Sequence, residues 1–329
     1  MRLAAIDLGS NTIHVLVADV GLGGASWRVV TSDQCVTRLG EGLAASGRLG
    51  VVPMERSTAV VVDYVARARD AGATRVAIVA TSAVREAANR AEFVAMLERA
   101  TGERVRVVAG EEEAALTLAG VLHGLDGPLD GTTVMFDIGG GSTEYVLVRA
   151  RTPVASVSLR LGVVDLAERH PFPGRVDWTR YRALQDEVAL RLARELPTVI
   201  RTARPDRIVG TAGTVTALAA LDLGLTHYDR ARVQGYRLER AAVARLLQRL
   251  GALTVTERGR LPCLEPARAD IIVPGTAVVL ATLEAFAAPG LMVSDAALRE
   301  GVVLELAGAV VGKPRVHAEE SGTGSPFEI

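Results

Sequence analysis

Short apolar segments alternate with longer amphipathic segments along most of the chain. Residues 3–6 form an apolar run that ends at Asp7, and alternating apolar positions at Ile13, Val15 and Val17 follow a turn. This pattern predicts a strand, a tight turn and a second strand. Further strands are predicted at 27–30, 76–80 and 105–108, and helices at 53–71, 91–100 and 111–123. Regular alternation of strands and helices indicates an α/β fold.

The opening pattern occurs a second time near the middle of the chain. Residues 124–131 are rich in Gly, Asp and Pro, which predicts a boundary. Ile-Asp-Leu-Gly-Ser-Asn-Thr at 6–12 then has a counterpart in Phe-Asp-Ile-Gly-Gly-Gly-Ser-Thr at 136–143. We interpret this as an internal duplication, with domains at 1–124 and 125–311 and a flexible tail at 312–329. In the second half we expect strands at 132–136, 154–159 and 291–294, and helices at 178–203, 213–222, 239–250, 266–287 and 297–310.

Composition narrows the class of protein. The chain has 329 residues, of which 49% are hydrophobic, and its formal net charge is −1. These values are typical of a globular protein with about two domains. A near-zero charge argues against a dedicated nucleic-acid or membrane binder. The most apolar stretch, 271–288, is interrupted by Pro274, Gly275 and Glu284, and the N-terminus has no signal-peptide pattern. We therefore expect a cytoplasmic protein with neither nucleic-acid nor membrane partners.

The numbers and positions of the lysine and cysteine residues exclude several kinds of functional site. Lys313 is the only lysine. A phosphate loop that ends in Gly-Lys-Ser/Thr and a Schiff-base lysine are therefore both excluded from the core. Cys35 and Cys263 stand far apart in the sequence, so no Cys-x-x-Cys zinc motif is present.

The glycine triplet at 139–141 predicts a phosphate-binding turn of an unusual kind. In a dinucleotide-binding fold such glycines open a helix, but residues 144–148 continue with strand character. The turn therefore belongs to a β-hairpin, in which glycines can adopt positive φ and point several N–H groups at one anion. We expect two facing hairpins to hold one terminal phosphate. The candidate donors are Ser10, Asn11, Thr12, Gly139, Gly140, Gly141, Ser142 and Thr143.

Two further features fit phosphate chemistry. The aspartates that end the two first strands of the duplicated pattern, Asp7 and Asp137, suit a divalent cation. Asp137 and Glu144 flank the second hairpin turn, and we expect these two carboxylates to bind Mg²⁺ or Mn²⁺ together with phosphate oxygens. The alternative is that Asp137 only stabilises its own turn. A third loop, with Gly210, Thr211 and Gly213, precedes a predicted helix whose N-terminal amides would attract an anion.

Seven segments together identify a family resemblance. They are Ile-Asp-Leu-Gly-Ser-Asn-Thr at 6–12, Ala-Thr-Ser-Ala-Val-Arg-Glu at 80–86, Gly-Glu-Glu-Glu-Ala at 110–114, Asp-Ile-Gly-Gly-Gly-Ser-Thr-Glu at 137–144, Gly-Thr-Ala-Gly-Thr at 210–214, Ala-Arg-Ala-Asp-Ile-Ile at 267–272 and Val-Ser-Asp-Ala-Ala-Leu-Arg-Glu-Gly at 293–301. In this order they resemble the exopolyphosphatase and guanosine pentaphosphate phosphohydrolase (Ppx/GppA) family over residues 1–311. The resemblance implies two ribonuclease-H-like α/β domains of the actin, hexokinase and Hsp70 type around a cleft. One departure is Asp165, which stands where the family commonly has arginine.

The resemblance also implies roles for individual residues. Glu113 matches the catalytic base, with Glu112 as the fallback. The alternative is that acidic residues in this first helical turn only complement the helix dipole. Repulsion among the carboxylates at 111–113 would raise at least one pKa. Arg85 matches a phosphate-binding arginine. For Arg268, Asp270, Asp295 and Arg299 we expect interdomain or helix-anchoring roles.

These features predict an exopolyphosphatase that hydrolyses terminal orthophosphate from inorganic polyphosphate. Longer family members carry extra helical domains, so we expect a preference for short chains. The nearest alternative is hydrolysis of the 5′ γ-phosphate of guanosine pentaphosphate. An ATP-dependent kinase or ATPase would need an adenosine pocket beside 210–213, and a phosphate sensor without activity is a further class. The sequence does not decide whether the protein forms a homodimer. A base on the first domain and a metal site on the second predict that domain closure controls turnover.

Overall fold

The computed structural model describes residues 1–125 and 130–309. The predicted tail at 312–329 lies outside the described residues. The first half contains a sheet with the strand order β3-β2-β1-β4-β5. Strand β2 is antiparallel to both of its neighbours, whereas β1, β4 and β5 are parallel. The strands are β1 (Arg2–Leu8), β2 (Thr12–Val20), β3 (Trp27–Val36), β4 (Arg75–Ala80) and β5 (Val105–Val107).

The second sheet repeats this topology. Its order is β10-β11-β9-β6-β7-β8, so without the added strand β10 the five remaining strands match the first sheet one by one. The duplication seen in the sequence is therefore confirmed, and the expected pair of ribonuclease-H-like α/β units is present. The strands are β6 (Thr132–Ile138), β7 (Thr143–Arg149), β8 (Thr152–Leu159), β9 (Arg207–Thr211), β10 (Arg237–Glu239) and β11 (Gly290–Val293).

Helices cover both sheets on both faces. Those of the first half are α1 (Leu43–Ser46), α2 (Val51–Asp70), α3 (Ser82–Glu86), α4 (Arg90–Thr101) and α5 (Gly110–Gly124). Those of the second half are α6 (Val163–Arg169), α7 (Trp178–Glu195), α8 (Thr198–Arg201), α9 (Ala212–Asp222), α10 (Arg230–Val233), α11 (Arg240–Gly251), α12 (Val255–Arg258), α13 (Ile272–Ala285) and α14 (Leu298–Leu306). Within 1–125 and 130–309, no helix has the length and apolar content needed to cross a bilayer.

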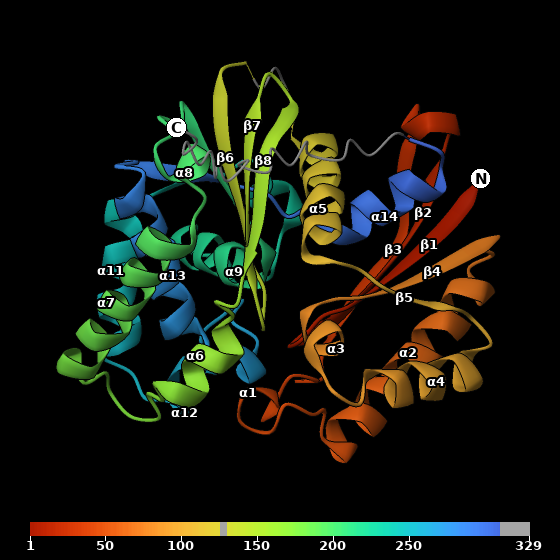
Figure 1. Cartoon of the computed structure of the whole chain (residues 1–329), viewed down its shortest axis with the longest axis horizontal. Helices are drawn as coiled ribbons and strands as arrows, with labels where there is room; N and C mark the ends of the chain where they lie inside the picture. The colour runs from red at the N-terminus through yellow and green to blue at the C-terminus, as the bar shows by residue number, and fades with distance from the viewer. Residues whose placement is uncertain (126–129, 310–329) are drawn as a thin grey trace, which may run out of the picture.

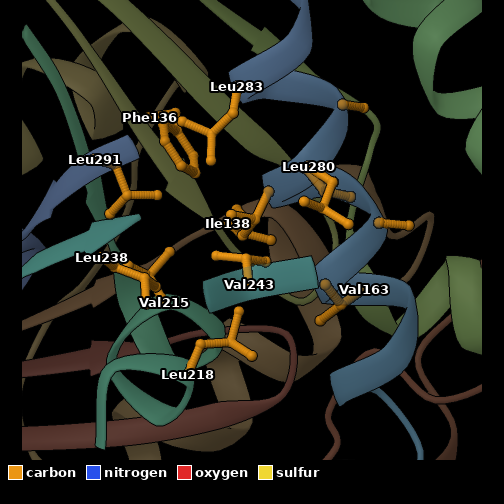
Figure 2. Close-up of a cluster of buried hydrophobic side chains, with 14 of the residues drawn as sticks. Phe136, Ile138, Val163, Val215, Leu218, Leu238, Val243, Leu280, Leu283 and Leu291 are labelled. Atoms are coloured by element: carbon orange, nitrogen blue, oxygen red, sulfur yellow. The ribbon is translucent and has the colours of Figure 1, made fainter. Parts of the chain in front are cut away.

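Each sheet has its own core on its outer face. In the first half, α2 and α4 contribute Met54, Val61, Phe93 and Leu97 to a cluster with the β-strands. In the second half, α7, α9, α11 and α13 pack against β6 and β7 in a larger cluster. Figure 2 shows part of this second cluster, in which Phe136 of β6 lies near Leu283 of α13. Alternating apolar residues in the strands dictate these two separate cores.

The inner faces are covered by exchanged helices. Helix α5 ends the first half of the chain, yet Leu118 and Val121 pack against Met135 and Val146 of the second sheet. Conversely, α14 follows the second sheet, and Val302 packs with residues of β1 and β2 in the first sheet. Figure 1 shows α5 and α14 side by side between the two sheets. The two halves are thereby joined by a reciprocal helix pair. The domain boundary at 124/125 remains a proposal.

Two predicted helices differ from the structure. The helix predicted at 178–203 is broken, since α7 ends at Glu195 and α8 begins at Thr198. Pro197 explains the break, because the residue before a proline is pushed out of the helical region. The helix predicted at 266–287 begins only at Ile272, and Pro266–Arg268 form a separate 3-10 turn.

The contact between α5 and α14 predicts an unusual response to alanine. A Cβ at Gly301 would lie 1.8 Å from the backbone oxygen of Leu116, so the helices would have to separate. Alanine normally favours a helix over glycine by about 0.5–1 kcal/mol. We expect Gly301→Ala instead to lower the free energy of unfolding by about 1–3 kcal/mol, as overpacked cores do. Urea denaturation measures this change.

The matched control is Gly174→Ala, because no atom lies within 4 Å of the added Cβ. Its free energy of unfolding should change by no more than about 0.5 kcal/mol. A Gly301→Ala variant as stable as the parent would show that the two helices do not depend on this contact.

Candidate active site

Two equivalent hairpin turns form the centre of the site. The β1–β2 turn is closed by a hydrogen bond from Gly9 N to Thr12 O of 3.2 Å, and the β6–β7 turn by one from Gly139 N to Ser142 O of 2.9 Å. The hairpin predicted around the glycine triplet is therefore confirmed, and the dinucleotide-binding alternative is excluded. The strand registers pair Asp7 with His14 and Asp137 with Glu144. His14 is thus the structural counterpart of Glu144.

The two turns touch each other. A Cβ at Gly140 would lie 2.9 Å from Asn11 N, and one at Gly141 would lie 2.6 Å from Ser82 Oγ. The glycines are therefore required for close approach between the halves. The expectation of positive φ was wrong, because none of Gly139, Gly140 and Gly141 is among the positive-φ glycines.

A cavity of about 540 Å³ lies where the turns meet. It is lined by most of the residues predicted from the sequence: Ser10, Asn11, Thr12, Glu113, Asp137, Gly139, Gly140, Gly141, Ser142 and Gly213. The phosphate-binding turns, the candidate base and one candidate metal ligand therefore share one space. Asp7, His14, Ser82, Arg268 and Arg299 also line it.

Other predicted residues lie behind this lining. Thr143 Oγ1 donates to Leu161 O at 2.6 Å, and Thr211 Oγ1 donates to Ser294 O at 2.8 Å. A Cβ at Gly210 would lie 2.8 Å from the Phe136 ring. These three residues support the loops from within. Glu144, only 1% exposed, also stands behind the cavity wall.

Of the three neighbouring glutamates at the start of α5, only Glu113 reaches the cavity. Glu113 is 8% exposed, whereas Glu112 is only partly buried and pairs with Arg106 at 3.5 Å. Burial raises the pKa of Glu113, and the neighbouring Arg85 guanidinium lowers it in part. The physical cause is therefore desolvation rather than repulsion along the helix turn.

Arg85 is held against the candidate base. Its Nη1 donates to Glu113 Oε2 at 2.7 Å and to Val108 O at 3.1 Å. The side chain does not line the cavity, so the structure associates Arg85 with Glu113 more directly than with the phosphate turns.

Buried carboxylates accumulate around the two turns. Burial raises the pKa of Asp7 and of Glu144 well above the usual range, and the negative charges of Glu113 and Asp137 add to both effects. Burial and the charge of Glu113 raise the pKa of Asp137 to about 7. The ion pairs formed within 1–125 and 130–309 include none of Asp7, Asp137 and Glu144. This excess of negative charge favours a bound cation.

Residues 1–125 and 130–309 contain no group of three His, Cys, Asp or Glu side chains close enough to hold a metal ion without other ligands. Mg²⁺ commonly needs only one or two carboxylates, because water and substrate phosphates complete its coordination. The donor set therefore fits a cation that binds together with a phosphate.

Arginines from the second half complete the cavity wall. Arg268 Nη2 donates to Thr12 Oγ1 and to Gln34 Oε1, both at 3.2 Å. Arg299 Nη1 is 3.1 Å from His14 Nδ1. Both contacts join the two halves, in line with the expected interdomain roles, but sequence reasoning did not place either arginine in the cavity.

Asp165, the departure from the family pattern, makes a local contact instead. Its Oδ2 accepts a hydrogen bond from Arg169 Nη2 at 3.0 Å, one turn along α6. Arg160 pairs with Glu86 at 3.2 Å.

Sequence reasoning also missed His14. Asp7, which ends the first strand as Asp137 ends its counterpart, was recognised as suited to a divalent cation, although Asp137 and Glu144 were preferred. For His14 only the hairpin register reveals the position opposite Asp7.

Comparisons with known proteins show what the chain is similar to. Exopolyphosphatase 2 of Mycobacterium tuberculosis is 36% identical over 325 residues, covering 93% of this chain and 99% of the relative. A solved structure of the Aquifex aeolicus member of the Ppx/GppA family is 30% identical, with a TM-score of 0.78 and coverage of 93% of this chain and 97% of that one. An exopolyphosphatase structure from Cytophaga hutchinsonii, 24% identical, shows the same fold with a TM-score of 0.87 over 95% of this chain and all of that one. The model of the Ppx/GppA phosphatase family matches residues 16–309, and the chain therefore belongs to that family.

Proposed function

We propose that this protein is a metal-dependent exopolyphosphatase, which releases terminal orthophosphate from inorganic polyphosphate by hydrolysis. The observation that carries the proposal is the shared cavity, where both glycine-lined turns meet beside Glu113. The exopolyphosphatase relatives support the substrate class.

The turns supply the phosphate-binding groups. Backbone N–H groups of Gly140 and Gly141, with the hydroxyls of Ser10, Thr12 and Ser142, surround the position of a terminal phosphate without any lysine. Because these donors are fixed by two hairpins, they need little reorganisation when the substrate binds.

A divalent cation, Mg²⁺ or Mn²⁺, fits the buried carboxylates. Asp7, Asp137 and Glu144 are the residues that would hold it, directly or through water, and their unpaired charge is the reason. When bound, the cation neutralises charge on the phosphate oxygens.

Glu113 is placed to act as the general base. Its carboxylate accepts a proton from water, the water oxygen forms a bond to the terminal phosphorus, and the phosphoanhydride P–O bond breaks. The products are orthophosphate and a chain shortened by one phosphate. No protein nucleophile is needed, because positioning and electrostatics supply most of the acceleration in phosphoryl transfer.

The alternative substrate is guanosine pentaphosphate, which the same residues would cleave with a different leaving group. The kinase or ATPase alternative is less consistent with the family to which the chain belongs. The Arg268 guanidinium packs directly against Gly213, where its Nη1 lies 1.5 Å from the position of an added Cβ.

Glu113→Gln tests the base. Loss of the proton acceptor should lower kcat by about 10²–10⁴-fold while KM for polyphosphate changes little. Orthophosphate release at saturating polyphosphate measures the effect. Glu112→Gln is the matched control, because Glu112 lies on the same helix turn, is only partly buried and does not line the cavity, and it should retain the parental rate. Parental activity in Glu113→Gln would remove this residue from the mechanism.

Arg85→Met separates two roles of the arginine. If Arg85 tunes the base, its removal raises the pKa of Glu113. A base must be deprotonated, so the acid limb of the kcat/KM profile should move to higher pH by about 1 unit or more. A rise in KM with an unmoved pH profile would instead indicate phosphate binding. Arg99→Met, on the exposed side of α4, should change neither quantity.

The charge of the cavity predicts a preference for short chains. Among the residues that the structure describes, its wall contains six carboxylates, Asp7, Asp33, Glu113, Asp137, Glu265 and Asp295, and three arginines, Arg230, Arg268 and Arg299. A long polyanion therefore gains little from this wall beyond the phosphates nearest the turns. Initial rates on short and long polyphosphates, guanosine pentaphosphate and ATP, measured in parallel, should be highest for short polyphosphate. Faster hydrolysis of long chains would contradict the preference, and faster hydrolysis of the guanosine compound would favour the alternative substrate.

A further inference from the structure

Ser158 contacts the buried carboxylate of the second hairpin. It lies near the end of β8, opposite Glu144 of β7 in the strand register. Its Oγ donates a hydrogen bond of 2.6 Å to Glu144 Oε1. A carboxylate with no room to reach solvent depends on such a donor for its orientation.

The same serine touches the helix that carries the base. A Cβ at Gly110, the first residue of α5, would lie 2.5 Å from Ser158 Cβ. Glu113 follows three residues later on the same helix. Ser158 therefore lies where the element carrying Glu144 meets the element carrying Glu113, and these elements belong to different halves of the molecule.

We propose that Ser158 is a positioning residue, which fixes the Glu144 carboxylate for a divalent cation at the point where α5 approaches the second sheet. This inference rests on the proposed function, because it assigns Glu144 to the metal. Ser158 itself touches neither the cation nor the reacting atoms.

The chain offers a matched control two residues away. Ser156 lies on the same face of β8, since side chains in a strand alternate. Its Oγ is buried and finds no hydrogen-bond partner among the residues that the structure describes. Each variant removes one hydroxyl from the same face of the strand. The two serines differ in the hydrogen bond to Glu144 and in the contact of Ser158 with Gly110.

Binding of Mn²⁺ to the full chain, followed by electron paramagnetic resonance with and without inorganic phosphate, tests the inference without relying on turnover. We expect Ser158→Ala to weaken Mn²⁺ binding about 10- to 100-fold, the usual effect of losing a partner that orients a metal ligand. Ser156→Ala should stay within about twofold of the parent, and Glu144→Gln should weaken binding at least as much as Ser158→Ala.

The outcomes separate this inference from the proposed function. Weak binding in Glu144→Gln with parental affinity in Ser158→Ala would overturn the role of Ser158 and leave the metal site in place. Parental affinity in Glu144→Gln would overturn the metal assignment, and the role of Ser158 with it. Equal losses in Ser156→Ala and Ser158→Ala would show a general effect on the strand and also overturn the inference.

Thermal unfolding monitored by circular dichroism shows whether each variant is folded. If Ser158→Ala does not fold, Ser158→Cys takes its place, because the thiol fills the contact with Gly110 but is a weak donor. Weakened Mn²⁺ binding in the folded cysteine variant supports the inference, and parental affinity overturns it.

Discussion

The backbone contact between α5 and α14 is the constraint on which the arrangement of the molecule depends. Gly120 and Gly301 occupy reciprocal positions, and an added Cβ at either one would lie within 2 Å of a backbone oxygen on the other helix. Because each helix covers the sheet of the opposite half, the contact fixes both halves at once. It also brings the first turn of α5, with Glu113, to the second hairpin. The proposed base and the proposed metal site, which come from different halves, therefore meet without depending on a flexible loop.

The exposed contacts between the two halves are of a weaker kind. Arg38 pairs with Asp270, but both side chains are about one-third exposed, and Gly42 N donates to the exposed Glu168 at 2.9 Å. Solvent screening limits each such contact to about 1 kcal/mol or less. Separating α5 from α14 would instead expose packed apolar residues, which costs about 25 cal/mol for every Å². If the two halves move relative to each other, rotation about the α5–α14 pair breaks the exposed contacts and leaves the helix pair intact. This rotation therefore costs less free energy than separating the two helices. Substrate phosphates between the turns would favour the closed arrangement.

Local pattern was sufficient to predict the hairpins and the duplicated topology, whereas Glu113 was singled out by the family resemblance and not by local pattern. The hairpins and the topology each depend on short segments whose periodicity or glycine content determines their conformation. The exchange of α5 and α14 was not predictable, because amphipathicity shows that a helix has an apolar face but not which sheet it covers. The same limit explains Ser158 and His14, whose roles follow from strand register. The glycine triplet was placed correctly in the hairpin turn, but the reason for its glycines was predicted wrongly. The turn requires glycine because the two halves approach closely there, and not because of positive φ.

The duplicated halves differ in residue type at one equivalent position, and this difference supports the separate tasks proposed for them. Glu144 of the second hairpin is a buried carboxylate, whereas its counterpart His14 lies beside Arg299. Burial, together with the positive charges of Arg299 and Arg268, lowers the pKa of His14 well below its usual value, so the ring is neutral at neutral pH. The second half thus attracts a cation more strongly than the first. The first half then contributes hydroxyl and amide donors from its turn and, through α5, the base. A symmetric pair of carboxylates would repel the substrate from both sides, so the loss of charge at position 14 permits the two turns to close on one phosphate.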